Sequence, residues 1–146
     1  METKNIIFEL RTNRGLSQDE LAERICVTRQ AVSRWENGET VPNTETLKLL
    51  SKLFDVSINT LLGSPRKLIC QCCGMPLEDS VISKEPDGDF NEDYCKWCYA
   101  EGQFAYKSKE ALLDYLVANM PNPDNLQGED RRIQFDSYLS RLKRWK

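Results

Sequence analysis

Six cysteines are the most reactive side chains of this 146-residue sequence, and four of them stand in two pairs. Cys70 and Cys73 form one C-x2-C pair, Cys95 and Cys98 form another, and 21 residues separate the pairs. Two such knuckles can place four thiolates at the corners of a tetrahedron, which is the ligand set of a structural zinc site. In a reducing compartment such grouping indicates metal rather than disulfides. The spacing therefore predicts one Zn²⁺ per chain, bound by these four cysteines.

Other uses of the same cysteines remain open at the level of sequence. An iron–sulfur cluster takes the same four ligands. A thioredoxin-like redox pair is less favoured, because no βαβ pattern surrounds either motif. Cys72 is left over, since neighbouring Cys72 and Cys73 can hardly both face one ion. Gly74 directly after the first pair allows the backbone to curl and to aim N–H groups at sulfur.

A second group of side chains has the chemistry to recognise DNA. Arg29, Gln30, Ser33 and Arg34 face outward on a predicted short helix. Arginine can bind guanine through two hydrogen bonds, glutamine can do so with adenine, and serine suits either base. An ordinary amphipathic helix pair is the alternative, but the outward face between Cys26 and Trp35 lacks acidic residues. The turn before this helix is also as short as a helix-turn-helix requires.

Two capping signals delimit the helices that must position these residues. Ser17 followed by Glu20 is a capping box, and Thr28 is the N-cap of the next helix. Asn37–Gly38 is a stop signal, because both residue types tolerate the left-handed conformation.

Three further helices complete a predicted five-helix bundle in residues 1–63. The first is expected to begin with a cap at Thr3 and to end at Gly15, the fourth to be capped by Thr44, and the fifth by Ser57. Residues 64–69, which begin Ser64-Pro65, form a predicted linker. Residues 70–146 form a second predicted domain, with helices over 109–119 and 129–144.

The second domain has few aliphatic residues between 70 and 105, so a metal would replace the missing core and its removal should unfold the domain. Ile133, Phe135, Tyr138, Leu139 and Leu142 are expected on the inner side of its last helix. The basic end, Lys143 to Lys146, is expected to remain solvated, with contact to DNA phosphates as the alternative.

Residues 4–63 resemble the Xre/Cro family of helix-turn-helix proteins, which are lambda-repressor-like. The resemblance rests on Leu16-Ser17-Gln18, Leu21-Ala22 and the run from Val32 to Gly38, followed by Pro42 and Leu47. It implies that Gln18 reaches the DNA backbone or a base and that Asn37 holds a phosphate. It also implies that Arg11 pairs with Glu36, whereas the residue types alone leave two separately solvated charges equally open; a surface pair would contribute about 0–1 kcal/mol. The predicted DNA-binding set is Gln18, Thr28, Arg29, Gln30, Ser33, Arg34 and Asn37.

Cys26 departs from that family's pattern, which has glycine at this position of the turn. The position often requires a positive φ, so a cysteine there costs about 1 kcal/mol. A tolerated small residue is favoured over a thiol sensor.

Residues 70–145 resemble a zinc-ribbon domain found in small bacterial proteins. The resemblance rests on C-x-x-C-G-M-P-L, on Tyr94 to Phe104, and on the final L-K-R-W. It implies a small ribbon with short β-hairpins and a bound metal, and it implies no activity. The fold class expected for the whole chain is mainly α.

Composition argues against several classes of function. The chain has no histidine, no glycine-rich phosphate loop and no nucleophile elbow, so no enzyme activity is expected. Residues 1–66 carry as many basic as acidic residues, and the net charge of −3 comes from the remainder. DNA affinity would therefore depend on a local basic face. With no apolar run long enough for a membrane and no signal-peptide pattern, a cytoplasmic location is expected.

The sequence thus predicts a DNA-binding transcriptional regulator of the repressor type. It is expected to bind double-stranded DNA as a homodimer, with the zinc module serving dimerisation, sensing or contact with a protein partner. Two alternatives remain: a protein-interaction adaptor, and a redox or zinc-responsive switch acting through Cys72 or Cys26.

Overall fold

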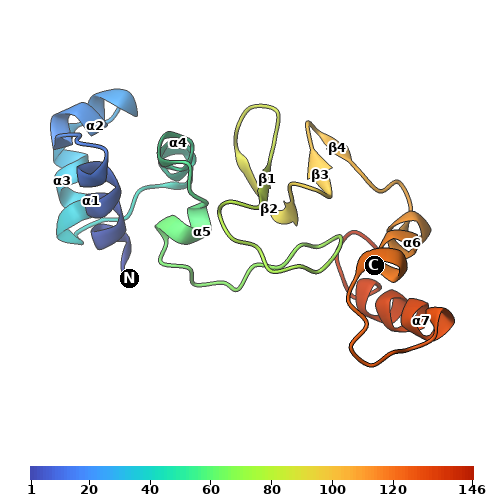
Figure 1. Ribbon diagram of the computed structural model, residues 1–146. Helices are drawn as coiled ribbons and strands as arrows, with labels where there is room; N and C mark the ends of the chain where they lie inside the picture. Colours follow the sequence, from blue (N-terminus) through green and yellow to red (C-terminus); the bar gives the residue numbers. More distant parts are fainter. The chain divides into compact units, whose positions relative to one another are not determined.

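A computed structural model describes residues 1–146, which form seven helices and two small two-stranded sheets (Figure 1). The chain divides into two compact units, one made of Met1–Lys67 with Gly88–Phe90, the other of Leu68–Asp87 with Asn91–Lys146. None of the seven helices combines the length and the apolar character that a membrane crossing demands. The predicted fold class, mainly α with short strand pairs, is confirmed.

The first unit is a five-helix bundle. Its elements are α1 (Thr3–Asn13), α2 (Gln18–Arg24), α3 (Arg29–Asn37), α4 (Thr44–Phe54) and α5 (Ile58–Leu61).

Three helices of this bundle begin after the predicted capping residue, and two begin one residue earlier than predicted. The Ser17 hydroxyl accepts from the Glu20 amide and the Glu20 carboxylate accepts from the Ser17 amide, which is the predicted capping box. Thr28 likewise caps α3, and Ser57 caps α5. The caps predicted at Thr3 and Thr44 are wrong, because these are the first helical residues. Asn43 caps α4 through the Thr46 amide, and Glu2 precedes α1 without a side-chain cap.

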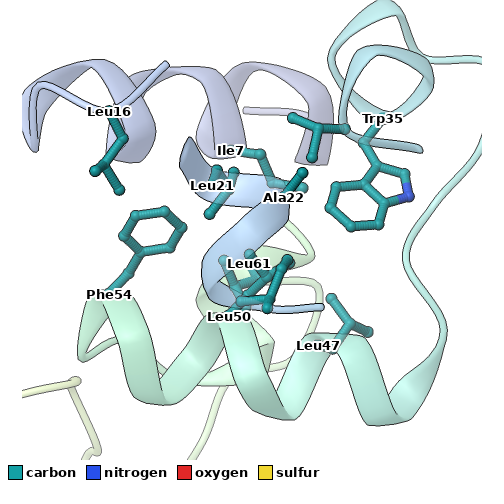
Figure 2. Close-up of a cluster of buried hydrophobic side chains, with 11 residues drawn as sticks. Ile7, Leu16, Leu21, Ala22, Trp35, Leu47, Leu50, Phe54 and Leu61 are labelled. Atoms are coloured by element: carbon teal, nitrogen blue, oxygen red, sulfur yellow. The ribbon is translucent and has the colours of Figure 1, made fainter. Parts of the chain in front are cut away.

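Apolar residues from all five helices meet in one core (Figure 2). Ile7 of α1, Leu21 of α2, Leu50 of α4 and Leu61 of α5 are fully buried, and the Trp35 ring of α3 packs with them. Because α3 contributes Val32 and Trp35 inward, its other side is left to face solvent. Packing thus fixes which face of α3 is available to a partner.

The turn between α2 and α3 has the backbone conformation that the sequence predicted. Cys26 has a φ of +58°, in the left-handed region, and its side chain is exposed. The Val27 amide donates to the Ala22 carbonyl at 3.0 Å, which closes the turn tightly. A residue with a Cβ is strained here, because L residues disfavour positive φ.

The second unit contains two short strand pairs and two helices. Strand β1 (Ile82–Lys84) pairs with β2 (Phe90–Cys95), and β3 (Tyr99–Ala100) pairs antiparallel with β4 (Gln103–Phe104), with Tyr99 opposite Phe104. Helices α6 (Lys109–Asn119) and α7 (Gly128–Leu139) follow, and Ser108 caps α6 as predicted.

Helix α7 is shorter than the predicted 129–144 and buries fewer of its residues. It ends at Leu139, and Leu142 is buried beyond it. Ile133 and Tyr138 were expected inside, but both are exposed, with 62% and 41% of their surfaces open. Beyond the helix, Lys143, Arg144 and Trp145 bond Gln71 and Cys72, and that tertiary contact has no periodic signal in the sequence.

Replacement of Cys26 by glycine should remove the strain of this turn. We expect Cys26→Gly to raise the free energy of unfolding of the first unit by about 0.5–1 kcal/mol, the strain relief being partly offset by glycine's greater unfolded-state entropy. Urea denaturation measures the change. Cys26→Ala keeps the Cβ and should leave stability unchanged; an equal gain in both variants would show that the thiol, not φ, is responsible.

Candidate metal centre and nucleic-acid interface

The four cysteines of the two C-x2-C pairs lie together in the second unit. The sulfur atoms of Cys70, Cys73, Cys95 and Cys98 are all within 4.8 Å of one another. Cys73 Sγ and Cys95 Sγ are 3.9 Å apart. Tetrahedral coordination with Zn–S bonds of about 2.3 Å sets neighbouring sulfurs about 3.8 Å apart. The donor set therefore fits one tetrahedral soft metal ion.

Backbone hydrogen bonds hold the first knuckle in shape. The Cys70 amide donates to the Met75 carbonyl, and the Gly74 amide returns to the Cys70 carbonyl, both at 2.8 Å. Gly74 has a φ of +82°, which favours glycine, and a Cβ there would also force the Tyr138 ring to move. The amides of Cys73 and Cys95 point at Cys70 Sγ, at 3.5 and 3.3 Å.

The second pair is placed by the strands. Cys95 is the last residue of β2, and Cys98 directly precedes β3. The Cys98 amide donates to the Cys95 carbonyl at 3.1 Å, which closes this knuckle. Cys70, Cys95 and Cys98 are buried, whereas Cys73 is half-buried.

The electrostatics of the cluster also favour a cation. Hydrogen bonds from Cys73, Cys95 and Cys98 lower the pKa of the Cys70 thiol. The pKa of Cys98 is raised, chiefly by its hydrogen bond with Cys70 and then by those with Cys72, Cys73 and Cys95. Four sulfurs this close cannot all ionise unless a positive charge offsets their repulsion. A divalent ion supplies that charge.

Cys72 lies outside the four-sulfur group, although it is fully buried. Its backbone carbonyl accepts a hydrogen bond of 2.8 Å from the Trp145 indole. This bond joins the end of the chain to the backbone of the first knuckle.

The backbone of the basic C-terminal end is bonded to the first knuckle, while Lys143 and Lys146 stay exposed as expected and Arg144 is half-buried. The amides of Lys143 and Arg144 bond the side chain and the backbone of Gln71, each at 3.0 Å. Lys143 Nζ pairs with Asp93 at 2.7 Å. The Arg144 guanidinium lies 4.2 Å from the centre of the Phe104 ring. Leu142 and Trp145 of this segment pack in the core around the cysteines, and the two lysines remain outside it.

The predicted base-reading residues gather on one surface of the first unit. Arg29, Gln30, Arg34 and Asn37 are exposed, and Ser33 is half-buried. All five line one shallow hollow of about 320 Å³ along α3. The Asn37 amide donates to the Ser33 hydroxyl at 3.5 Å, so these two are already linked.

Gln18 and Thr28, the other two predicted DNA-binding residues, are not among those lining the hollow. Thr28 accepts from the Ala31 amide as the cap of α3. Gln18 Nε2 donates to Glu36 Oε1 at 3.2 Å, which leaves its second N–H available. Glu39 lines the hollow and was not predicted to take part; its position beyond the end of α3 gave no signal in the sequence.

A charged pair joins α1 to α3. Arg11 Nε and Nη2 donate to the two oxygens of Glu36 at 2.7 and 2.8 Å, and Arg11 Nη1 donates to the Leu16 carbonyl. The pairing of Arg11 with Glu36 is therefore confirmed, and because the side chains are only 11% and 6% exposed it is not a surface pair. Hydrogen bonding to Glu36 raises the pKa of Arg11 despite burial. With Gln18, the network ties α1, α2 and α3 together.

The fold and the site define a chain with an N-terminal helix-turn-helix unit and a C-terminal zinc ribbon. Family models agree: residues 7–61 match "Helix-turn-helix", and residues 69–146 match "Putative zinc ribbon domain". The second match spans more than half of the chain. The chain therefore belongs to this zinc-ribbon family, and its first unit is an Xre-like helix-turn-helix domain.

Three curated relatives, all named as HTH-type regulators, each match less than half of this chain. The HTH-type transcriptional activator BcrR of Enterococcus faecalis is 47% identical over 63 residues, which cover 43% of this chain and 31% of BcrR. YonR of Bacillus subtilis, an uncharacterized HTH-type transcriptional regulator derived from the SPbeta prophage, is 38% identical over 36% of this chain and 48% of its own. YgzD of the same organism, also an uncharacterized HTH-type transcriptional regulator, is 38% identical over 38% of this chain and 83% of its own. The match thus spans about a third of the first relative and half of the second.

Breaking the Arg11–Glu36 pair should destabilise the first unit. Glu36→Gln leaves the Arg11 guanidinium without its counter-charge in a largely buried site, so we expect a loss of about 2–3 kcal/mol in the free energy of unfolding. Urea denaturation measures it. Glu45→Gln, the same change in the exposed pair with Lys48, is the control and should cost less than about 0.5 kcal/mol. Equal losses in the two variants would contradict the assigned role.

Metal removal should unfold the second unit and leave the first folded. We expect a strong chelator to abolish the near-ultraviolet circular dichroism of the aromatic residues around the cysteines, since metal binding contributes about 10 kcal/mol or more in small zinc modules. Cys98→Ser should behave like the chelated protein, and Cys26→Ser should retain the metal. A chelated protein with unchanged tertiary signal would contradict this prediction.

Proposed function

We propose that the protein is a sequence-specific, DNA-binding transcriptional regulator that carries one structural zinc ion per chain. The observation that supports this most directly is the gathering of Arg29, Gln30, Ser33, Arg34 and Asn37 on the exposed side of α3. The names of the relatives, all HTH-type regulators, support the same function.

In the proposed complex, α3 enters the major groove. Gln30 pairs with the N6 and N7 atoms of adenine, Arg29 or Arg34 pairs with guanine, and Ser33 contacts either base. Gln18 and Thr28 approach the phosphates from the ends of α2 and α3, and Asn37 binds a phosphate beyond the bases. Gln18 suits this role because Glu36 fixes its amide while one N–H stays free.

Local charge supports DNA binding on this surface. Arg29 and Arg34 project from α3, and Arg29 forms an ion pair with Asp19 at 4.0 Å in which both side chains are mostly exposed. Such a long, exposed pair contributes little, so Arg29 can exchange Asp19 for a phosphate or guanine at small cost. Glu39 at the edge of the hollow would repel a misplaced phosphate and so restrict the register of binding.

In the proposal, Cys70, Cys73, Cys95 and Cys98 hold Zn²⁺ in a closed structural site. The ion supplies folding energy to a unit with a small aliphatic core, and no open ligand position is left for catalysis. We therefore propose that the protein is not an enzyme. The zinc and its four thiolates carry a net charge of about −2, which suits contact with protein better than with phosphate.

We propose that two copies bind one operator. A single helix-turn-helix of this size makes few base contacts, and proteins of this kind bind two half-sites about 34 Å apart as dimers. A protein-interaction adaptor is the competing function, because the exposed face of α3 can also dock a protein.

Two observations point to opposite directions of regulation. The resemblance to Xre/Cro repressors favours repression, and repression is our proposal, whereas the Enterococcus faecalis relative is named an activator. A reporter gene placed behind the selected operator distinguishes the two: its expression should fall when the protein is produced.

Selection of genomic DNA fragments by the zinc-loaded, full-length protein tests the proposal. At a fixed salt concentration of about 0.15 M, because phosphate contacts make affinity salt-dependent, a site of two-fold symmetry should be enriched. Recovery of no preferred sequence would refute base reading by α3 and favour the adaptor.

Replacement of Gln30 should alter base preference. We expect Gln30→Ala to lose discrimination at one position in each half-site, with about 5- to 150-fold weaker binding to the best site, since a bidentate contact contributes about 1–3 kcal/mol. Fluorescence anisotropy on single-base variants of the site measures this. Lys48→Met, on α4, should leave both preference and affinity unchanged.

A further inference from the structure

The second unit contains a large apolar cavity that the proposed function does not use. It has a volume of about 580 Å³ and is lined by the first knuckle, by Trp97 and Tyr106, and by residues of α6 and α7. Ligand sites in proteins typically measure about 300–1,000 Å³, so the cavity has the size of a small-molecule site.

The lining indicates the chemistry of the occupant. No Asp, Glu, Lys or Arg lines the cavity, so it offers no counter-charge to an ion. Five aromatic side chains line it instead, namely those of Trp97, Tyr106, Tyr115, Phe135 and Tyr138. Such walls favour flat rings through offset stacking and edge contacts. Tyrosine hydroxyls supply the few polar groups that would orient a ligand.

Several of the aromatic side chains that line the cavity are also exposed to solvent. Trp97 is 57% exposed, Tyr115 46% and Tyr138 41%, although large aromatic side chains are usually buried. The Tyr106 and Tyr115 rings already pack at 6.0 Å between centroids, so part of the aromatic wall is assembled. Tyr138 is held in place because its hydroxyl donates to the Gly74 carbonyl at 3.2 Å.

We propose that this cavity binds a neutral, aromatic small molecule. The shape favours this occupant over a second copy of the chain, because a stable protein interface needs about 800 Å² from each partner. Here the aromatic residues line one cavity of about 580 Å³, a volume that suits a small molecule. The absence of charged lining residues argues against an anionic or cationic ligand.

Binding would contact the metal centre directly. Cys73, Cys95 and Cys98 all line the cavity, and Cys73 is the least buried of the four clustered cysteines. A ligand lying over Cys73 would cover that sulfur from solvent. The bound molecule should therefore slow the loss of metal to a competing chelator. This proposal is independent of DNA binding, since the whole cavity belongs to the second unit.

The test uses Nile red, a neutral aromatic dye whose fluorescence rises in apolar surroundings, with the zinc-loaded full-length protein. We expect saturable binding of one dye per chain and at least about twofold slower zinc release to a chelator in its presence. Tyr115→Glu should weaken dye binding at least about tenfold, because a carboxylate would have to be desolvated in an apolar wall.

Ile133→Glu is the matched control. Ile133 is 62% exposed on the same unit, and it does not line the cavity. This variant should bind the dye as the wild type does, and both variants should keep the wild-type zinc content and near-ultraviolet circular dichroism.

Three results would overturn the proposal. The first is no saturable dye binding by the wild type, and the second is equal loss in Tyr115→Glu and Ile133→Glu. The third is conversion of dimers to monomers by the dye in analytical ultracentrifugation, which would assign the cavity face to a second copy. Failure to select an operator sequence would refute the proposed function and leave this test unaffected.

Discussion

Four cysteine sulfurs within 4.8 Å of one another are the constraint on which the second unit depends. Its strands are two to six residues long, and its aliphatic core consists largely of leucines from α6, α7 and the residues after α7. Without an ion, four thiolates this close would repel one another in a buried site. A bound ion would offset that repulsion and cross-link the four cysteines. The aromatic cluster of Tyr94, Tyr99 and Phe104 and the returning chain end pack around that centre.

The first unit is held together by a different interaction, a charged pair between two helices. The Arg11–Glu36 pair, with Gln18, joins α1, α2 and α3 and so fixes these helices relative to one another. A pair this deeply buried contributes less to net stability than its attraction implies, because both charges lose hydration. Its benefit is geometric: the bidentate fork allows one relative placement of α1 and α3. The exposed side of α3 is thereby held in place before any partner binds.

The metal module and the helical bundle differ in how they respond to change. Removal of the metal should unfold the second unit as a whole, whereas the first unit distributes its stability over a core drawn from all five helices. The cavity beside the cysteines adds a way to influence the metal module without chelation. A ligand that covers Cys73 would bias the retention of metal, and thereby the folding of the unit.

Local signals in the sequence determined where several helices begin and where the cysteine knuckles lie. Side-chain caps at Ser17, Thr28 and Ser57 begin helices because their hydroxyls bond amides only three residues away. The positive φ at Cys26 agrees with the glycine that the resembling family has at this position. The C-x2-C spacing likewise encodes each knuckle, although binding of zinc there remains a prediction. Contacts between distant residues were decided only by the tertiary structure. The burial of Arg11–Glu36, the early end of α7, the bond from Trp145 to Cys72 and the aromatic cavity all join segments far apart along the chain. No periodicity or spacing reports such contacts, because they depend on how the folded elements pack.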